Sequence, residues 1–159
     1  PLHFIGHLQT NKVRQVVGVA SLIQSVDSEH LLNAVNRQAE KKELCQEILL
    51  EINVGAEASK SGVSPAQLDA LAQAAGQLEH VRVRGLMAIP PADCTEVQTR
   101  CYFEQMRMLF ERLDAQQIPN VQMDYLSMGM SGDFESAILE GANIVRVGTA
   151  LFGARSYPV

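Results

Sequence analysis

Two stretches near the C-terminal end of the chain, residues 126–133 and 143–153, each contain a short apolar run that ends in small residues. In the first stretch Ser131 stands where a helical pattern begins. Its hydroxyl and the amides after it are therefore expected at a helix N-terminus, where an anion is favoured. In the second stretch Gly148 and Thr149 follow a strand pattern and add backbone N–H groups and a hydroxyl. Together these residues predict one concave patch of donors that binds a phosphate group.

Arg146 lies two residues before Gly148 and would bring a positive charge to the same patch. Each assignment has a structural alternative. Ser131 can be a helix N-cap without a ligand, although N-capping and anion binding are compatible roles. Gly148 can be a simple turn at a strand end, and Arg146 can be a structural arginine paired with a carboxylate such as Glu135 or Glu140.

Four further residues are candidates for the same site or its rim. His3 and Met87 lie on predicted strands whose ends face one mouth, where they would line a ligand; ordinary core packing is an equal alternative for both. Lys60, in a polar loop, can bind an anion near the mouth or be a solvated lysine. Glu51 is the carboxylate best placed within a strand to act as a base. His3 and His7 are four residues apart, a spacing that would form a metal-binding pair on a helix. They lie on a predicted strand, whose side chains alternate between faces, so no metal site is expected.

The composition suits one globular domain that takes a small ligand. The chain has 159 residues, of which 47% are hydrophobic and 19% are charged, and its net charge of -5 argues against a nucleic-acid surface. No apolar run approaches the roughly 18 residues that a membrane span needs, so no membrane contact and a cytoplasmic location are expected. The three cysteines, Cys45, Cys94 and Cys101, form no C-x-x-C pair and are interpreted as buried or idle reduced thiols.

Strand and helix patterns alternate along the whole chain. Predicted strands cover residues 2–8, 21–26, 47–54, 81–89, 121–128 and 143–147, and predicted helices cover 12–20, 29–42, 64–78, 95–113 and 132–140. Ser64 and Thr95 are expected to cap their helices, because each is followed three residues later by a glutamine that can complete a capping box. Most of the strands are apolar on both faces, which indicates a parallel sheet covered by helices.

A doubly wound sheet is the default for this alternation. A (β/α)₈ barrel of the TIM type accounts better for the site, because such barrels commonly bind phosphate after strands seven and eight. Six strands cannot close an eight-stranded barrel, which typically needs about 200 residues or more. We therefore expect residues 1–159 to form a single partial barrel domain, with six parallel strands that correspond to strands three to eight.

The motifs from His3-Phe4-Ile5-Gly6 to Phe152-Gly153-Ala154-Arg155 resemble, in order, those of the pyridoxal phosphate homeostasis protein family. The barrel of that family is similar to the N-terminal domain of alanine racemase. In the family, a lysine at the end of the first strand forms a Schiff base with the cofactor, and the segment that carries it does not occur here. None of the four lysines present, Lys12, Lys41, Lys42 and Lys60, lies in such a context. The resemblance thus implies an incomplete, truncated piece of the barrel.

The resemblance also implies a cofactor, pyridoxal 5′-phosphate. Its phosphate would contact Ser131, Gly148 and Thr149, and Arg146 would face its pyridine nitrogen. Since arginine does not give up its proton, that nitrogen would stay unprotonated and the ring would be a weak electron sink. The expected function is to bind, store and deliver pyridoxal phosphate, with apo-enzymes that depend on it as partners and an influence on amino-acid and keto-acid balance, without robust catalysis.

Two enzymatic alternatives stay open. An amino-acid racemase of similar fold uses a second base, usually a tyrosine from a C-terminal domain, and Tyr157 stands in the tail of this chain. A sugar-phosphate isomerase or lyase could use the same phosphate site with Glu51 as its base. Colour distinguishes the cofactor from a sugar phosphate, because only bound pyridoxal phosphate absorbs in the near-ultraviolet or visible range.

Overall fold

The computed structural model describes residues 1–57 and 60–153. One six-stranded sheet contains β1 (His3–Phe4), β2 (Leu22–Val26), β3 (Gln46–Ile52), β4 (Val81–Ala88), β5 (Val121–Met130) and β6 (Ile144–Arg146). The helices are η1 (Thr10–Lys12), α1 (Val13–Val16), α2 (Glu29–Lys41), α3 (Leu68–Gly76), α4 (Glu96–Asp114), α5 (Phe134–Leu139) and α6 (Thr149–Phe152). Every neighbouring pair of strands is parallel, and the strands follow chain order from β1 to β6.

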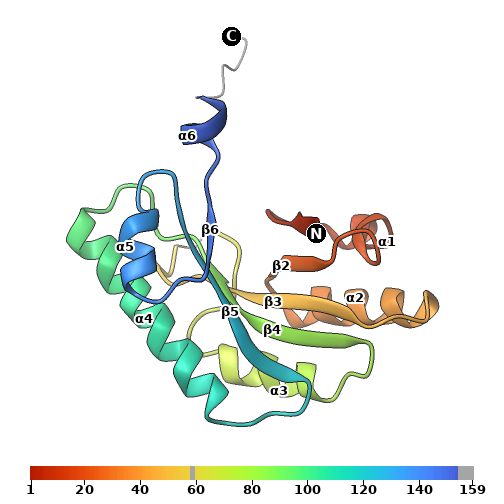
Figure 1. The fold of residues 1–159 in the computed structure, drawn as a ribbon. Helices are drawn as coiled ribbons and strands as arrows, with labels where there is room; N and C mark the ends of the chain where they lie inside the picture. Colours follow the sequence, from red (N-terminus) through yellow and green to blue (C-terminus); the bar gives the residue numbers. More distant parts are fainter. Residues whose placement is uncertain (58–59, 154–159) are drawn as a thin grey trace.

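The sheet is curved, and helices α2, α3, α4 and α5 cover its outer side (Figure 1). Strands β1 and β6 are its two edges and do not pair with each other, so the six described strands form an open part of a barrel. Helix α6 stands beyond the end of β6, apart from the other helices (Figure 1). This arrangement confirms the prediction of an incomplete barrel with six parallel strands.

Both faces of the sheet are apolar, but they pack against different partners. On β3, Ile48 and Leu50 belong to the large core cluster between sheet and helices, together with Leu32 of α2 and Phe103 of α4. The intervening side chain, Leu49, belongs to a separate inner cluster of Leu22, Leu49 and Met87, packed by Tyr125 and Ile144. Because side chains alternate along a strand, one run of apolar residues fills both layers.

Charged side chains form ion pairs near the start of the strands. The Arg84 guanidinium pairs with Glu47 of β3 and, through Nε at 2.7 Å, with Asp124 of β5. It also lies 5.4 Å from the centre of the Tyr125 ring, a cation–π distance. These contacts join β3, β4 and β5 at the end of the sheet away from the strands' carboxyl ends.

One predicted capping box is confirmed, and the other is only half formed: the Gln67 side chain accepts the Ser64 N–H at 3.1 Å, but the Ser64 hydroxyl does not accept the Gln67 N–H. Thr95 accepts the N–H of Gln98, and the Gln98 side chain accepts the N–H of Thr95, so α4 begins as expected. Ser64 instead donates its hydroxyl to the Gln67 side chain at 2.9 Å, and the Gln67 N–H goes to the Ser64 carbonyl. Residues 65–67 therefore form a turn, and α3 begins only at Leu68.

The N-terminal elements are shorter than the hydrophobic pattern predicts. The strand expected over residues 2–8 is reduced to β1, and the helix expected over 12–20 ends at Val16. Val17 leaves the helical conformation with ψ 126°, and Gly18 follows at φ +77°. Lys42, just after α2, donates to the carbonyls of Arg14 and Val17 at 3.1 and 2.6 Å, which satisfies the end of α1.

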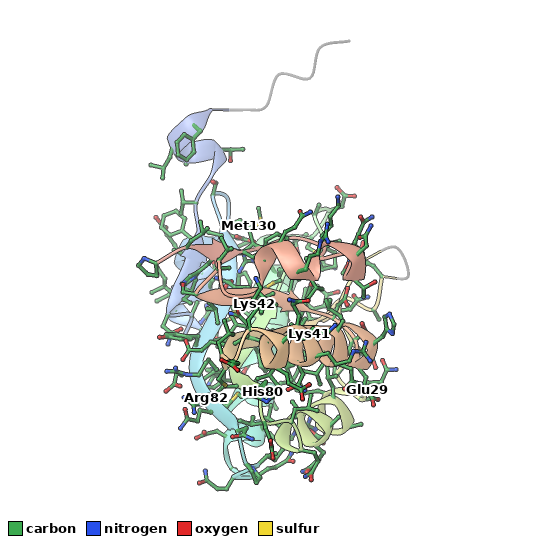
Figure 2. All side chains as sticks on the ribbon, turned by 90° about the vertical axis from the view of Figure 1, so that its right-hand side faces the viewer. Glu29, Lys41, Lys42, His80, Arg82 and Met130 are labelled. Carbon is green, nitrogen blue, oxygen red and sulfur yellow. The ribbon has the colours of Figure 1, made fainter. Side chains whose placement is uncertain are left out.

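The parallel strands place all their carboxyl ends on one side. Figure 2 shows Met130, the last residue of β5, toward one end of the molecule and Arg82, near the start of β4, toward the other. In the part of the chain that the structure describes, no helix is long and apolar enough to span a membrane. Cys45 and Cys101 are free and exposed, so of the two expected forms, buried or idle reduced thiols, these two are not buried.

Candidate functional site

A cavity of about 1230 Å³ opens on the inner side of the sheet at the carboxyl ends of the strands. All six residues predicted for the site line it: His3, Met87, Ser131, Arg146, Gly148 and Thr149. Gln24 of β2 and Ile144 of β6 complete the wall below them. The fold thus brings together residues that are up to 146 positions apart in the chain, while their role toward a ligand stays a prediction.

Ser131 does not lie at the N-terminus of the helix that follows it in sequence, contrary to the sequence-based expectation. Strand β5 continues to Met130, and α5 begins at Phe134 rather than at Gly132. The Asp133 side chain accepts the N–H of Met130 at 2.6 Å, which folds residues 130–133 into a turn before the helix. The Ser131 hydroxyl bonds to the start of α6, the short helix after β6, and not to the amides of α5.

In that position the Ser131 Oγ accepts two backbone N–H groups, from Gly148 and from Ala150, each at 3.2 Å. Both bonds are made to Ser131, and the predicted role of Gly148 and Thr149 toward a phosphate stays a prediction. The space around the Gly148 and Gly132 backbones is open, since a Cβ added at either would meet no atom within 4 Å. We call the Ser131 hydroxyl and these two amides the cradle; Ser131 and Gly148 line the cavity, and Gly148 has no side chain to fill it.

Arg146 reaches the cavity wall through two neutral anchors. Its Nη1 donates to the Ser127 hydroxyl at 2.6 Å and its Nη2 to the Ala88 carbonyl at 3.0 Å. Burial lowers the pKa of the guanidinium below its ordinary value, while the charges of Asp133 and Glu51 oppose that shift.

The structural alternative for Arg146, an ion pair with Glu135 or Glu140, is wrong for Glu140. That carboxylate pairs with Arg100 at 2.8 Å and with Arg107 at 3.5 Å, both on α4. Within residues 1–57 and 60–153, Arg146 has no carboxylate within ion-pair distance. Its positive charge is consequently not neutralised by a direct contact, and arginine has further N–H donors to offer a ligand.

Sequence reasoning missed two polar residues that support this arginine. Ser127 of β5 is fully buried and donates its hydroxyl to the Gln24 side chain at 2.6 Å. Gln24 of β2 is also buried, and its amide nitrogen lies 3.0 Å from Nδ1 of His3. The signal that marks both residues is a polar side chain inside an otherwise apolar strand, which must find a partner when it is buried.

Glu51 lies beside Met87 in the register of β3 and β4, and Met87 lies beside Ser127 of β5. The Oε2 atom of Glu51 is buried and makes no hydrogen bond to the described residues. Burial, and secondarily the charge of Asp27, raise the pKa of this carboxyl to about 7, against the opposing charges of His7 and Arg146. Near neutral pH, Glu51 is thus present in both its protonated and its ionised form.

Lys60 does not line the cavity; its side chain is partly exposed and also bonded within the protein. Its Nζ donates to the carbonyl of Pro90 at 3.0 Å and pairs with Glu57 at 2.6 Å. These bonds hold the loop after β3 against the segment after β4. His7 pairs with Asp27 at 3.2 Å, and no cluster suited to a metal ion occurs in the described part of the chain.

The sequence matches the family described as alanine racemase, N-terminal domain, over residues 1–156. A pyridoxal phosphate homeostasis protein from Aquifex aeolicus is 46% identical over 155 residues, which are 98% of this chain and 67% of that protein. The solved structure of PipY from Synechococcus elongatus with PLP bound has a TM-score of 0.84 at 38% identity, over 95% of this chain and 69% of that one. The same protein without PLP has a TM-score of 0.88.

An alanine racemase from Clostridium difficile has a TM-score of 0.70 at 18% identity, a likeness that shows the barrel fold alone. The chain spans about two thirds of the length of the curated relatives it matches, between 64 and 67% of each. With 46% identity over nearly its whole length and the fold of PipY, the chain belongs to the pyridoxal phosphate homeostasis protein family, within the alanine racemase N-terminal domain type.

Proposed function

We propose that this protein binds pyridoxal 5′-phosphate and serves in cofactor homeostasis, holding the cofactor and delivering it. The observation that carries the proposal is the Ser131 hydroxyl, which accepts the amides of Gly148 and Ala150 and lines, with Gly148, the same cavity as Arg146. The relative PipY, solved with PLP bound, supports the choice of cofactor.

The residues fit a phosphate ester. The Ser131 oxygen marks a point at which two backbone N–H groups converge, and a phosphate oxygen is a stronger acceptor for such donors than a hydroxyl. With an anion in place, the Ser131 hydroxyl would donate to it rather than accept. The Thr149 side chain, on the same wall, adds a second hydroxyl. The open space at Gly148 lets the anion approach the backbone closely.

The residues also fit the ring. His3, Met87 and Ile144 offer flat or apolar surface on the cavity wall, and Arg146 offers N–H donors without an ion-pair partner among the described residues. A bound pyridoxal ring supplies an electron sink for chemistry at an amino-acid α-carbon. Arg146 can only donate to the ring nitrogen and cannot transfer its proton, so it weakens that sink. We propose on this ground that the protein has no robust turnover of its own.

The proposal extends to the setting in which the protein acts. Apo-enzymes that require pyridoxal phosphate would receive the cofactor, and amino-acid and keto-acid levels would respond to its supply. The cytoplasm is the proposed location. The racemase alternative depends on a second base such as Tyr157, which lies outside the described residues.

A binding experiment tests the proposal. Pyridoxal 5′-phosphate, pyridoxal and a sugar phosphate are titrated by calorimetry, with the near-ultraviolet and visible spectrum recorded in parallel. We expect pyridoxal 5′-phosphate to bind at least about tenfold more tightly than pyridoxal, since charged hydrogen bonds contribute about 1.5–3 kcal/mol each. Equal affinity for the two would overturn the phosphate assignment. Tight sugar-phosphate binding that pyridoxal 5′-phosphate does not displace would instead favour an isomerase or lyase.

A further inference from the structure

A chain of hydrogen bonds crosses the inner face of the sheet from Arg146 to His3. Arg146 Nη1 is 2.6 Å from Ser127 Oγ, Ser127 Oγ is 2.6 Å from Gln24 Oε1, and Gln24 Nε2 is 3.0 Å from His3 Nδ1. These four residues come from β6, β5, β2 and β1, at sequence separations of 19, 103 and 21. The chain therefore spans the open barrel between its two edge strands.

The chemistry of arginine fixes the direction of the first of these bonds, and the orientation of the Gln24 amide sets the direction of the other two. A guanidinium has donors only, so the Ser127 oxygen must accept from Arg146 and pass its own proton onward. The acceptor for that proton is the carbonyl oxygen of the Gln24 amide. The Gln24 amide nitrogen then faces His3 Nδ1, which must present a lone pair, and His3 carries its proton on Nε2. With the Gln24 amide in this orientation each group has one role, and a proton on His3 Nδ1 would face the Gln24 N–H donor.

Two features show that this row of hydrogen bonds orients the Arg146 guanidinium and does not neutralise its charge. Ser127 is fully buried and Gln24 is 2% exposed, so a broken link would leave an unsatisfied polar group away from water. The second anchor, the Ala88 carbonyl, holds the other terminal nitrogen of the same planar group. Two neutral anchors on two nitrogens fix the plane of the guanidinium while leaving its full positive charge for a ligand in the cavity.

We propose that Ser127 and Gln24 are positioning residues that aim Arg146 at the ring of the bound ligand; this rests on the proposed function. They act on recognition of the ring nitrogen and not on the phosphate. Loss of the Ser127 hydroxyl frees the guanidinium to rotate about a single remaining anchor. Loss of the Gln24 amide leaves the Ser127 proton without its acceptor, which lets the hydroxyl turn away from its present direction.

The first test needs no ligand. In the protein labelled with ¹⁵N, the anchored Nη groups of Arg146 are expected as separate, slowly rotating resonances. Ser127→Ala and Gln24→Met should each speed that rotation by about tenfold or more, whereas Ser127→Thr, which keeps the hydroxyl, should restore it. Ser25→Ala is the matched control, because Ser25 is equally buried next to Gln24 but its hydroxyl makes no hydrogen bond to the described residues. Unchanged Arg146 resonances in both Ser127→Ala and Gln24→Met would overturn the inference.

The second test measures the consequence for binding. The affinity for pyridoxal 5′-phosphate is divided by the affinity for its analogue with C–H in place of the ring nitrogen. We expect Ser127→Ala to lower that ratio by about tenfold and Gln24→Met by less, while Ser25→Ala leaves it unchanged. Ser131→Ala, which removes a phosphate contact, should weaken both ligands equally.

The two tests separate this inference from the proposed function. If neither ligand binds the unaltered protein while Arg146 rotation responds to Ser127→Ala, the proposed cofactor is wrong and the anchoring of Arg146 stands. If both ligands bind and Ser127→Ala leaves the ratio unchanged, the positioning role is overturned and the cofactor assignment stands. Should Ser127→Ala fail to fold, Gln24→Met decides the question by the same two measurements.

Discussion

The hydroxyl oxygen of Ser131 lies 3.2 Å from the backbone nitrogen of Gly148, although the two residues are 17 positions apart and follow different strands. The same oxygen also accepts the N–H of Ala150. The loops after β5 and β6 are thus joined by the very groups that we propose for phosphate binding. Such a preformed cradle lowers the ordering cost of binding, since little has to move when an anion replaces the hydroxyl as acceptor.

Removing both hydroxyls of this cradle should weaken the binding of phosphate esters. The double variant Ser131→Ala with Thr149→Val is expected to lose about 1–3 kcal/mol for each hydroxyl that bonds a charged oxygen. Calorimetric titration with pyridoxal 5′-phosphate measures the loss. Ser136→Ala, on α5 and outside the cradle, is the control and should bind as before. Unchanged affinity in the double variant would remove Ser131 and Thr149 from the site.

Replacing the arginine by a carboxylate should change the chemistry of the ring. In Arg146→Glu the carboxylate would stabilise a protonated ring nitrogen, which Arg146 disfavours. We expect a shifted absorbance band of the bound cofactor and faster exchange of the α-hydrogen of added amino acids with solvent deuterium. Arg146→Met separates the gain of the carboxylate from the loss of arginine, and it should not speed exchange. If the spectrum and the exchange rate are the same in Arg146→Glu as in the unaltered protein, Arg146 does not contact the nitrogen.

Glu51 should make the protein less stable as the pH rises. Its pKa in the folded state, about 7, lies above the ordinary value of 4.5, because burial disfavours the carboxylate. Between these two pH values the folded state binds more protons than the unfolded state, so the free energy of unfolding falls with rising pH and levels off above pH 7. Glu51→Gln should abolish this fall and raise stability at pH 8 by about 1–3 kcal/mol.

Urea denaturation from pH 4.5 to pH 8 provides the measurement for Glu51→Gln. Glu135→Gln is a matched control, since Glu135 is an exposed glutamate on α5. Its pH profile should follow that of the unaltered protein. A Glu51→Gln profile that falls with pH as steeply as the unaltered one would show that another group causes the dependence.

Gly85 should not tolerate a side chain. It has φ +145° in β4, and an added Cβ would overlap the carbonyl oxygen of Tyr125 on β5. Gly85→Ala is expected to cost a few kcal/mol of folding free energy, through backbone strain and overpacking. Gly132→Ala is the control, because a Cβ there meets no atom within 4 Å. Thermal denaturation of both variants tests the contrast, which is absent if their melting temperatures are equal.

The sequence by itself determined the parallel sheet, the long helices and the family. These features depend on local patterns, such as the apolar run of β3 and the Thr95 and Gln98 pair that starts α4. A buried strand needs apolar side chains on both faces, and a helix start needs local hydrogen-bond acceptors. Both signals therefore lie within a few consecutive residues of the sequence. It also placed the six predicted site residues at strand ends, which a parallel sheet gathers at one edge.

Only the tertiary structure decided which groups these residues contact. Ser131 was expected at the N-terminus of the helix that follows it, and it instead accepts amides at the start of α6, after the next strand. An ion pair of Arg146 with Glu140 was one alternative. Arg146 is instead held by Ser127 and Ala88, and Arg100 of α4 pairs with Glu140. The bond from Ser127 to Gln24 joins residues 103 positions apart. Such bonds depend on strand register and on the curvature of the sheet, which no local pattern specifies.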